Sequence, residues 1–416
     1  MKKLFMVTLL LTLSVSLYAQ TNVSGGIYSN TTWTKANSPY LVTSELVIFD
    51  SLTIEPGVTV LFDSKVKINV RGTLTAIGTK TDSIIFVNSQ AKANWSGIYI
   101  LGTLNAKYCI FEGADTAVNY VDTISFCSFI NNSVGVYYGG GFDSCSFTNN
   151  VTAISNPGLV KNSYFNLNTY AITSGLTVSN CIFENNTNGI TAPQDLVDSC
   201  TFLNNGKAIL EYNDVGDPYF TNNYLKGNNI AFAVYNNGSY TGNTIIGNDT
   251  GMYVDGAGAY PVEFKNNIIC HNTYNIVLNT TYNVDAQKNC WCLSDSAAIR
   301  ATIYDGYTNI NLGLVYFDPF NTCTDPTTIT AITAAQNLPT SFVTVAPNPN
   351  SGSFNVQLQG NTTPCAYSVY DGRGTTVANG TISNNGSVNL SGSTPGIYYL
   401  VVFSGQQKYT EKVVVE

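Results

Sequence analysis

The middle of the chain repeats one short pattern of apolar and polar positions. A small residue is followed two positions later by Phe or its equivalent and five positions later by Asn, in segments starting at Cys127, Cys145, Ser163, Cys181 and Cys200. These starts are 18, 18, 18 and 19 residues apart. A period of 18 residues without helical spacing is typical of one coil of a β-solenoid. We therefore expect coils of two or three short strands each.

The small residue and the Phe of each period lie two positions apart, so both side chains point to the same side of a strand. Stacked coils lie about 4.8 Å apart, so equivalent residues form columns. The pattern predicts an inward Phe column and an Asn column at a turn, because Asn tolerates left-handed backbone and its amide can bond the next coil. The columns comprise Phe111, Phe129, Phe147, Phe165, Phe183 and Phe202, and Asn132, Asn150, Asn168, Asn186, Asn205, Asn228, Asn248 and Asn272.

This repeat resembles the right-handed parallel β-helix family, the architecture of pectate-lyase-like proteins, over roughly residues 40–320. The segment 289–320 resembles the exit segment of that family, with Cys292 where a Gly is usual. The resemblance implies an all-β chain whose residues 20–320 form a parallel β-helix. This scaffold carries lyases, hydrolases and binding proteins, so the fold alone does not fix the function.

The N-terminus has the pattern of a signal peptide. Lys2 and Lys3 precede an apolar run of 14 residues from Leu4 to Leu17, and small residues favour cleavage between Ala19 and Gln20. An uncleaved membrane anchor is the alternative, although 14 residues are few for a membrane span. We expect residues 1–19 to be removed on export, and the mature chain to contain no transmembrane span.

The C-terminal part reads as a linker followed by a second domain. Residues 321–341 are rich in Thr and Ala without a sustained pattern, which favours a linker. Residues 342–416 alternate apolar and polar positions between Gly-rich turns, as in a small Ig-like β-sandwich.

The motifs of this second domain resemble, in order and spacing, the type A C-terminal sorting domain of the type IX secretion system. The resemblance implies two partners, the secretion machinery and a sortase-like peptidase that removes the domain. It also implies a secreted protein or one on the outer-membrane surface of a Gram-negative bacterium, either released or anchored to lipopolysaccharide. A resident Ig-like adhesive module is the alternative. The matching residues are Pro347, Asn348, Pro349, Gly352, Asp371, Gly374, Gly396, Tyr398 and Lys412.

Charge narrows the range of partners. The chain carries 18 Lys and Arg against 26 Asp and Glu, a net charge of −8. Nucleic acid is therefore not an expected partner, because phosphate binding needs a basic surface. The only His is His271, and the only Arg residues are Arg71, Arg300 and Arg373. That scarcity argues against zinc–His sites and against mechanisms that combine a His–carboxylate pair with Arg clamps, and no cofactor is expected.

The sequence contains no obvious catalytic cluster. A lyase of this architecture needs carboxylates for Ca²⁺ and a basic residue near the sugar, and a hydrolase needs paired acids. Among the isolated carboxylates of the repeats, Asp195 and Asp198 lie three positions apart, as do Asp214 and Asp217, but such pairs suit turns at least as well. We assign no catalytic or metal-ligating residue. Binding of polysaccharide or other surface molecules is favoured, with a polysaccharide lyase or glycoside hydrolase, or a structural or adhesin stalk, as alternatives.

Cysteine and tyrosine leave two questions open. Ten Cys in an exported chain invite disulfides. The Cys of the repeat, however, occupy equivalent inward positions where they can act as small apolar residues. Cys290 and Cys292 flank Trp291 without a second such pair, so a structural zinc site is not expected. Tyr outside the columns suits sugar stacking or protein contact, or simply reflects β-propensity. These residues are Tyr120, Tyr137, Tyr138, Tyr212, Tyr219, Tyr235, Tyr240, Tyr253, Tyr260 and Tyr274.

Overall fold

The computed structural model divides the chain into two units, one ending at Asp325 and one beginning at Pro326. We call the first unit the body and the second the tail. The structure describes residues 20–89, 94–212, 217–256, 262–323, 325, 343–358, 364–370, 376–390, 392–404 and 407–415. Within these residues no helix has the length and apolar character needed to cross a membrane. The fold is all-β, as the sequence predicted.

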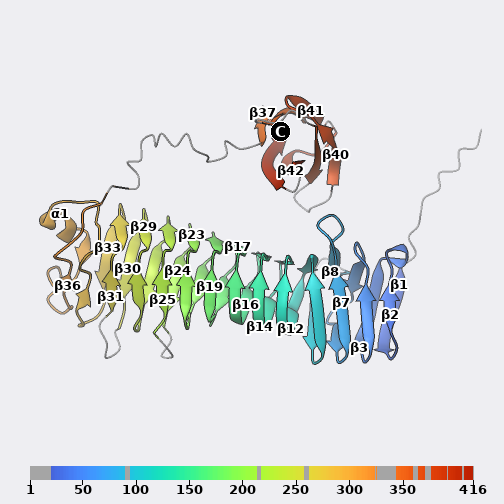
Figure 1. The fold of residues 1–416 in the computed structure, drawn as a ribbon, viewed down its shortest axis with the longest axis horizontal. Helices are drawn as coiled ribbons and strands as arrows, with labels where there is room; N and C mark the ends of the chain where they lie inside the picture. The colour runs from blue at the N-terminus through green and yellow to red at the C-terminus, as the bar shows by residue number, and fades with distance from the viewer. Residues whose placement is uncertain are drawn as a thin grey trace, which may run out of the picture. The chain divides into compact units, whose positions relative to one another are not determined.

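The body is a parallel β-solenoid, with its strands stacked from β1 at one end to α1 at the other (Figure 1). Each coil contributes strands to three faces. The strand β1 (Thr21–Ile27) pairs along β3 (Tyr40–Ile48), which runs from the first face into the second. The first face continues with β5 (Thr59–Phe62), β8 (Ile84–Asn88), β11 (Cys109–Glu112), β13 (Ser128–Ile130), β15 (Ser146–Thr148), β17 (Tyr164–Asn166), β20 (Ile182–Glu184), β23 (Thr201–Leu203), β26 (Tyr224–Lys226), β29 (Thr244–Ile246) and β32 (Ile268–Cys270).

Three long strands cover both the second and the third face. They are β12 (Ala114–Ser125), β14 (Val134–Asp143) and β16 (Thr152–Lys161). The rest of the second face comprises β6 (Lys67–Val70), β9 (Trp95–Ile100), β18 (Tyr170–Thr173), β21 (Asn188–Thr191), β24 (Lys207–Glu211), β27 (Ile230–Val234), β30 (Thr250–Val254), β33 (Tyr274–Leu278) and β35 (Ile303–Tyr304).

The third face lies between the second face of one coil and the first face of the next. Besides the ends of β12, β14 and β16, it comprises β2 (Thr31–Trp33), β4 (Ser51–Ile54), β7 (Thr73–Ile77), β10 (Thr103–Lys107), β19 (Thr177–Ser179), β22 (Leu196–Asp198), β25 (Tyr219–Thr221), β28 (Ser239–Thr241), β31 (Glu263–Lys265), β34 (Val284–Asp285) and β36 (Val315–Tyr316). Among the described residues of the body, two short helices occur, η1 (Lys35–Asn37) and α1 (Ser296–Arg300).

The Phe side chains of the repeat stack along the inside of the first face. From Phe86 through Phe202, neighbouring ring centroids lie 4.7–4.9 Å apart with interplanar angles of 4–13°. All of these rings are completely buried. Further along, Leu225, Ile245 and Ile269 continue the column in register. Parallel stacking thus follows directly from the 18-residue period and the spacing between coils.

The Asn column closes the corner between the first and second faces with hydrogen bonds. The backbone N and Nδ2 of Asn132 both donate to Oδ1 of Asn150, at 3.0 Å each, and Nδ2 also donates to the Phe111 carbonyl at 3.1 Å. The pattern repeats down to Asn272, whose Nδ2 bonds Oδ1 of Asn275. Each buried side-chain amide therefore bonds backbone groups of the preceding coil and, through Nδ2, the amide oxygen of the next coil.

Replacing Asn150 with Ala should lower the free energy of unfolding by about 1–3 kcal/mol. The change removes the acceptor for two donors of Asn132 and the donor to the Phe129 carbonyl, all of which stay buried. Urea unfolding followed by circular dichroism measures the loss. Val151→Ala is the matched control, because Val151 is the exposed next residue and belongs to neither column. Equal shifts for the two variants would mean that the amide hydrogen bonds contribute nothing.

A second column follows the corner between the third and first faces, and the sequence analysis did not recognise all of it. Six small residues begin it, from Cys109 to Cys200, and Cys127, Ser163 and Cys181 each accept a hydrogen bond from the backbone of the preceding coil, as Ser163 does from the Cys145 backbone N at 3.2 Å. Then Asn takes over, with Oδ1 of Asn223 accepting from Cys200 N at 3.0 Å. The Asn members are Asn223, Asn243, Asn267 and Asn289.

The Cys of this column are free thiols, which resolves the question of bridges between neighbouring coils. All are buried, and burial raises the pKa of Cys145 to about 12. A buried thiol of this kind is a poor nucleophile. These residues therefore fill the corner as small side chains with weak hydrogen-bonding capacity.

The tail has its own antiparallel strands and core. One sheet comprises β37 (Val343–Ala346), β38 (Ser353–Leu358) and β41 (Gly386–Asn389). The other comprises β40 (Thr376–Ile382), β39 (Cys365–Tyr370), β42 (Gly396–Ser404) and β43 (Gln407–Val415). Side chains from both sheets share one buried cluster, including Phe354, Val356, Leu400 and Val413. This arrangement matches the small β-sandwich that the alternating pattern predicted.

Several residues of the sorting motif lie in or beside the strands of the tail. Oδ1 of Asn348, between Pro347 and Pro349, accepts from the Val414 backbone N at 2.8 Å. Gly352 has a φ of +93°, and Gly396 begins β42. The Tyr398 hydroxyl is buried and donates to the Thr394 carbonyl at 2.6 Å, and Lys412 pairs with Tyr399 along β43. Asp371 and Gly374 lie outside the described residues, as does Ala19, while Gln20 is exposed.

Candidate functional site

The corner between the second and third faces is occupied by Tyr in two neighbouring coils, at Tyr120 and Tyr138. Its backbone is left-handed, with φ from +51° to +58° at Tyr120, Tyr138, Asn156, Ser174 and Ala192. Asn is common in this conformation, but a bulky side chain such as Tyr is not. Residues held in such sparsely populated conformations cluster at functional sites. Tyr120 and Tyr138 therefore mark a candidate site.

The rings at this corner form a compact aromatic surface. Tyr120 and Tyr138 stack with centroids 5.4 Å apart and an interplanar angle of 10°. Tyr137 lies edge-on to both, at 6.1 and 4.8 Å. Tyr120 and Tyr138 remain 56% and 42% exposed, so their stacking does not bury them.

Beside these rings lies a shallow open pocket of about 260 Å³ with a floor of bare backbone. Gly139 and Gly140 line it, together with Asp122 and Asn156. A Cβ on Gly139 would meet the Phe142 ring at 2.4 Å, and one on Gly140 would meet the Asp122 carbonyl at 2.5 Å. Packing against the coil interior and the neighbouring strand thus keeps this floor free of side chains.

A second aromatic pair stands at the opposite edge of the third face. Tyr108 and Phe126 also have left-handed backbones, with φ of +52° and +55°, and their rings stack at 5.0 Å. Nζ of Lys107 lies 5.5 Å from the Tyr108 centroid and 5.1 Å from that of Phe126. Phe126 lies six positions after Tyr120, one residue beyond the end of β12, which corresponds to roughly 20 Å of extended chain.

We call the surface between the two pairs the aromatic strip. Its chemistry suits a sugar chain, because an aromatic ring can cover the apolar face of a sugar while carboxylate, amide and ammonium groups bond the hydroxyls. Sequence analysis had named Tyr120 and Tyr138 only as members of a longer set. Their 18-residue spacing was the available signal that they share a corner. The strip comprises Lys107, Tyr108, Tyr120, Asp122, Phe126, Tyr138 and Gly139–Gly141.

The carboxylates near the strip act as braces between coils. Asp143 accepts from Asn162 at 2.9 Å and Ser144 at 3.0 Å, and its carboxylate lies 3.3 Å from Lys161 Nζ. The hydrogen bond from Asn162 is the main cause that lowers the pKa of Asp143. A general acid needs the opposite shift. Asp143 is thus a poor proton donor for glycosidic cleavage.

The Asp pairs noted in the sequence behave similarly. Burial would raise the pKa of Asp198, but hydrogen bonds from Thr221, Asn222 and Ser199 outweigh it, and the pKa is lowered. Oδ2 of Asp195 accepts from the Thr177 hydroxyl at 3.2 Å. Of the other pair, Asp214 lies outside the described residues. The hydrogen bonds of Asp195 and Asp198 thus link neighbouring coils.

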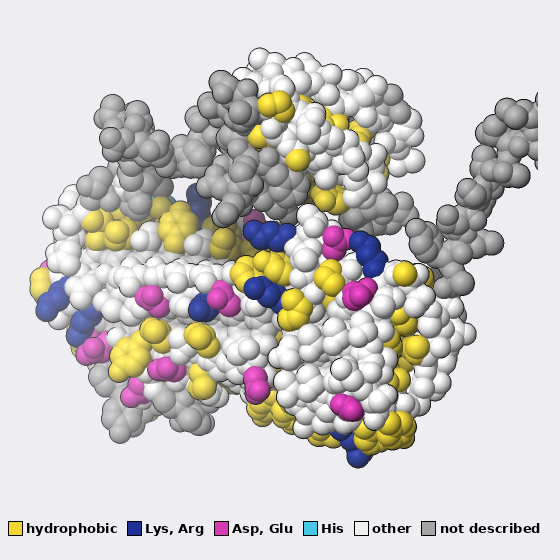
Figure 2. Space-filling view, turned by 45° about the vertical axis from the view of Figure 1, so that its right-hand side comes forward, with side chains coloured by type: hydrophobic (Ala, Val, Ile, Leu, Met, Phe, Trp, Pro, Cys, Tyr) yellow, Lys and Arg dark blue, Asp and Glu magenta, His cyan; other side chains and the backbone are white. Residues whose placement is uncertain are grey.

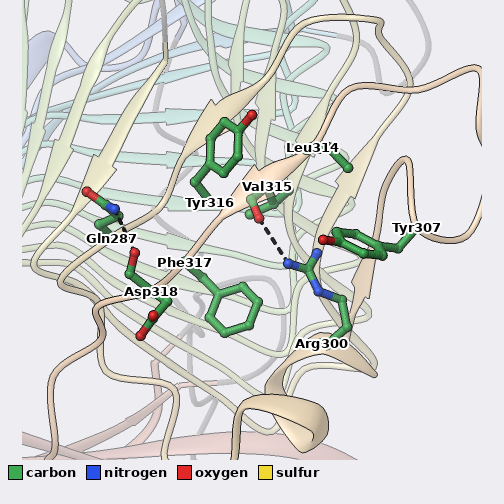
Figure 3. Close-up of a pocket in the computed structure, with 8 residues that line it drawn as sticks. All are labelled: Gln287, Arg300, Tyr307, Leu314, Val315, Tyr316, Phe317 and Asp318. Atoms are coloured by element: carbon green, nitrogen blue, oxygen red, sulfur yellow. Dashed lines mark hydrogen bonds between the residues drawn. The ribbon is translucent and has the colours of Figure 1, made fainter.

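A pocket of about 180 Å³ near the C-terminal end of the body contains Arg300 (Figure 3). The guanidinium lies 4.4 Å from the Tyr307 ring and 4.6 Å from the Phe317 ring. It donates to the fully buried Asp305 at 2.6 Å and to the Val315 carbonyl at 3.2 Å. Its charge is therefore paired and both neighbours are aromatic, which identifies Arg300 as part of the packing that closes the body.

Charged side chains of both signs are interspersed on the face shown in Figure 2. Several form exposed pairs across coils, such as Lys65 with Asp115 at 2.8 Å. Such pairs contribute little to stability. The mixture of signs also differs from the basic surface that nucleic-acid binding requires.

Four cysteines meet at the end of the body, a feature that the sequence analysis missed. Disulfides join Cys270 to Cys292 and Cys290 to Cys323. The sulfur atoms of Cys290, Cys292 and Cys323 lie within 4.8 Å of one another, but paired sulfurs are not thiolate ligands for a metal. Cys292 has a φ of +53°, which explains why a Gly suits this position in the resembling family.

His271 also acquires a partner that is distant in sequence. Its Nε2 lies 2.6 Å from Oδ2 of Asp325, 54 residues away. Asn321, Cys323 and Asp325 lie just beyond the expected end of the β-helix at 320, and all three contact its last coils. His271 is thus explained by a structural contact.

Comparisons with known proteins identify both parts of the chain. Residues 122–269 match the right handed beta helix region, and residues 344–416 match the secretion system C-terminal sorting domain. Two distant solved structures are those of a mutant of the periplasmic alginate epimerase AlgG and of an alginate lyase from Paenibacillus sp. strain FPU-7. The first is 13% identical over 68% of this chain and 74% of that chain, with a TM-score of 0.27. The second is 12% identical over 64% and 93%, with a TM-score of 0.22.

No curated protein matches the chain. The family matches, and this chain's own parallel sheet in the body and antiparallel sheets in the tail, agree with the resemblances drawn from the repeat and from the tail motifs. The sorting domain also implies contact with the type IX secretion machinery. The chain is therefore a right-handed parallel β-helix protein with a type IX C-terminal sorting domain, secreted by or displayed on the surface of a Gram-negative bacterium.

Proposed function

We propose that the protein binds a polysaccharide along the aromatic strip and does not cleave it. The observation that carries this proposal is the pair of aromatic stacks, exposed Tyr120 with Tyr138 and half-buried Tyr108 with exposed Phe126, at the two edges of one face. A chain lying along β12 would contact both stacks and the glycine floor between them. The proposal also suits the secreted or surface location, where extracellular glycans are the available ligands.

The charges near the strip favour a neutral or weakly charged glycan. Lys107 lies at one edge and Asp122 at the other, so neither sign dominates. A strongly acidic glycan would meet Asp122 and only one free base on the strip, Lys107, because Lys161 beside the strip is paired with Asp143. Proteins instead bind neutral sugars by stacking aromatic side chains on them and by individual hydrogen bonds to polar groups.

In a binding assay with the mature chain, Tyr138→Asn should weaken the affinity for the bound glycan at least about tenfold, equivalent to about 1.4 kcal/mol. Asn suits the test because Asn156 occupies the same corner in the next coil, so the left-handed backbone is retained while the ring is lost. A panel of neutral and acidic glycans identifies the ligand, and titration calorimetry then compares the variants. Tyr274→Ala is the control, since Tyr274 is similarly exposed but lies on the second face.

Three outcomes would contradict the proposal. Unchanged affinity in Tyr138→Asn would exclude the strip as the binding surface. Formation of shortened or unsaturated sugars, with or without Ca²⁺, would establish a hydrolase or lyase. No binding to any member of the panel would favour a structural or adhesin stalk.

A further inference from the structure

The two disulfides at the end of the body connect in series. Cys323 bonds Cys290, and two positions later along the chain Cys292 bonds Cys270 on β32. Only Trp291 stands between the two middle cysteines. A covalent path of a few residues therefore runs from Cys323 to the last strand of the first face.

This path bypasses most of the exit segment. The sequence separations of the two bonds are 22 and 33 residues, and the segments 271–289 and 293–322 lie outside the path. These segments contain β33 to β36, α1 and the Arg300–Asp305 pair. We propose that the two disulfides form a load-bearing tie, which carries tension from the C-terminal side of the body directly into the coil of β32.

The bypassed segment is where such tension would otherwise act first. Its terminal strands β35 and β36 are two residues long, and each has two residues in register with the coil before it. By contrast, β29 and β32 have three. Short parallel pairings loaded from one end would separate before longer ones. A tie that skips them protects the weakest pairings of the body.

The tie is buried in the body at Cys270 and in its middle. Cys270 is completely buried, and Trp291 is 1% exposed. Cys290 continues the first face through parallel bridges to Ile268 and to Asn321. The contact of His271 with Asp325 joins the same two chain segments without a covalent bond.

The sorting domain provides a source of tension on this tie. It follows the body in the chain, so a machine that grips the tail pulls on the body through residues just beyond Cys323. A surface anchor that is joined where the tail is removed would also pull on the body through these residues. This inference rests on the sorting domain and is independent of glycan binding.

Single-molecule pulling on the mature chain from its two termini tests the tie. For the oxidised wild type, we expect no extension event from the bypassed segments 271–289 and 293–322 before the regular coils unfold. Cys323→Ser should add an early event at lower force that releases about 30 residues, or roughly 100–110 Å. Cys181→Ser is the control, because it removes a free thiol from a column in which Ser163 already fits.

Reduction of the folded wild type provides a second measurement that does not depend on the folding of a variant. Dithiothreitol should release about 50 residues early, or roughly 160–180 Å, because both bonds open. If neither Cys323→Ser nor reduction produces an early event, packing alone holds the exit segment and the proposal is wrong. An early event in the oxidised wild type would also overturn it.

Discussion

Replacing Phe147 with Ala should lower the free energy of unfolding of the body by about 3–5 kcal/mol. The ring is completely buried between Phe129 and Phe165, with both centroids 4.9 Å away, and Phe142 contacts it edge-on at 6.2 Å. Backbone pairing fixes the distance between coils, so the neighbouring rings cannot close the cavity. Urea unfolding of purified mature protein, monitored by circular dichroism, measures the loss.

The control for Phe147→Ala lies on the same strand. Thr148 is the next residue of β15 and is not part of the buried core, so Thr148→Ala should change the stability by less than about 1 kcal/mol. A small shift for Phe147→Ala would show that the cavity costs nothing and that the stacked rings do not hold the coils together. A large shift for both variants would point to the strand itself rather than to the ring.

Removing the tail should abolish delivery to the cell surface and leave the body folded. The body and the tail have separate buried clusters, and a folding unit with its own core can fold alone. The cut belongs after Asp325, because a cut after Phe320 would remove Cys323 and leave Cys290 without its partner. We expect the truncated protein to accumulate in the periplasm, since the signal peptide serves only the inner membrane.

Mass spectrometry of the surface protein tests the fate of the tail. We infer that the sortase-like peptidase removes it, so peptides from β43 should be absent from mature surface material and present in cells with a blocked secretion system. Detection of peptides ending at Glu416 on the surface would instead show that the tail is a resident adhesive domain. Folded truncated protein on the surface would contradict a sorting role.

The regular part of the body was predictable because one period fixes several contacts at once. The spacing of Phe129, Phe147 and Phe165 implies stacking, and the position of Asn150 implies a turn that the next coil can bond. Both follow from the distance between parallel strands. The second Asn column was less visible, since its corner changes from Cys200 to Asn223 just where the intervals become irregular.

The site and the disulfides depended on information that a period does not carry. Left-handed corners at Tyr120 and Tyr138 contradict the usual preference for Asn or Gly, so local propensity gave no signal for them. The bonds Cys270–Cys292 and Cys290–Cys323 join segments outside the repeat, and pairing among several cysteines cannot be deduced from their order. The partner of His271 is likewise 54 residues away.

The amide corner makes each coil an interchangeable unit. Asn132 bonds Asn150 in the same way as Asn150 bonds Asn168, and Phe129 meets Phe147 as Phe147 meets Phe165. Loss of residues 146–163 through unequal recombination would therefore bring Phe165 against Phe129 and Asn168 against Asn132 without a new kind of contact. Duplication or loss of one coil can thus lengthen or shorten the β-helix of this protein by about 4.8 Å.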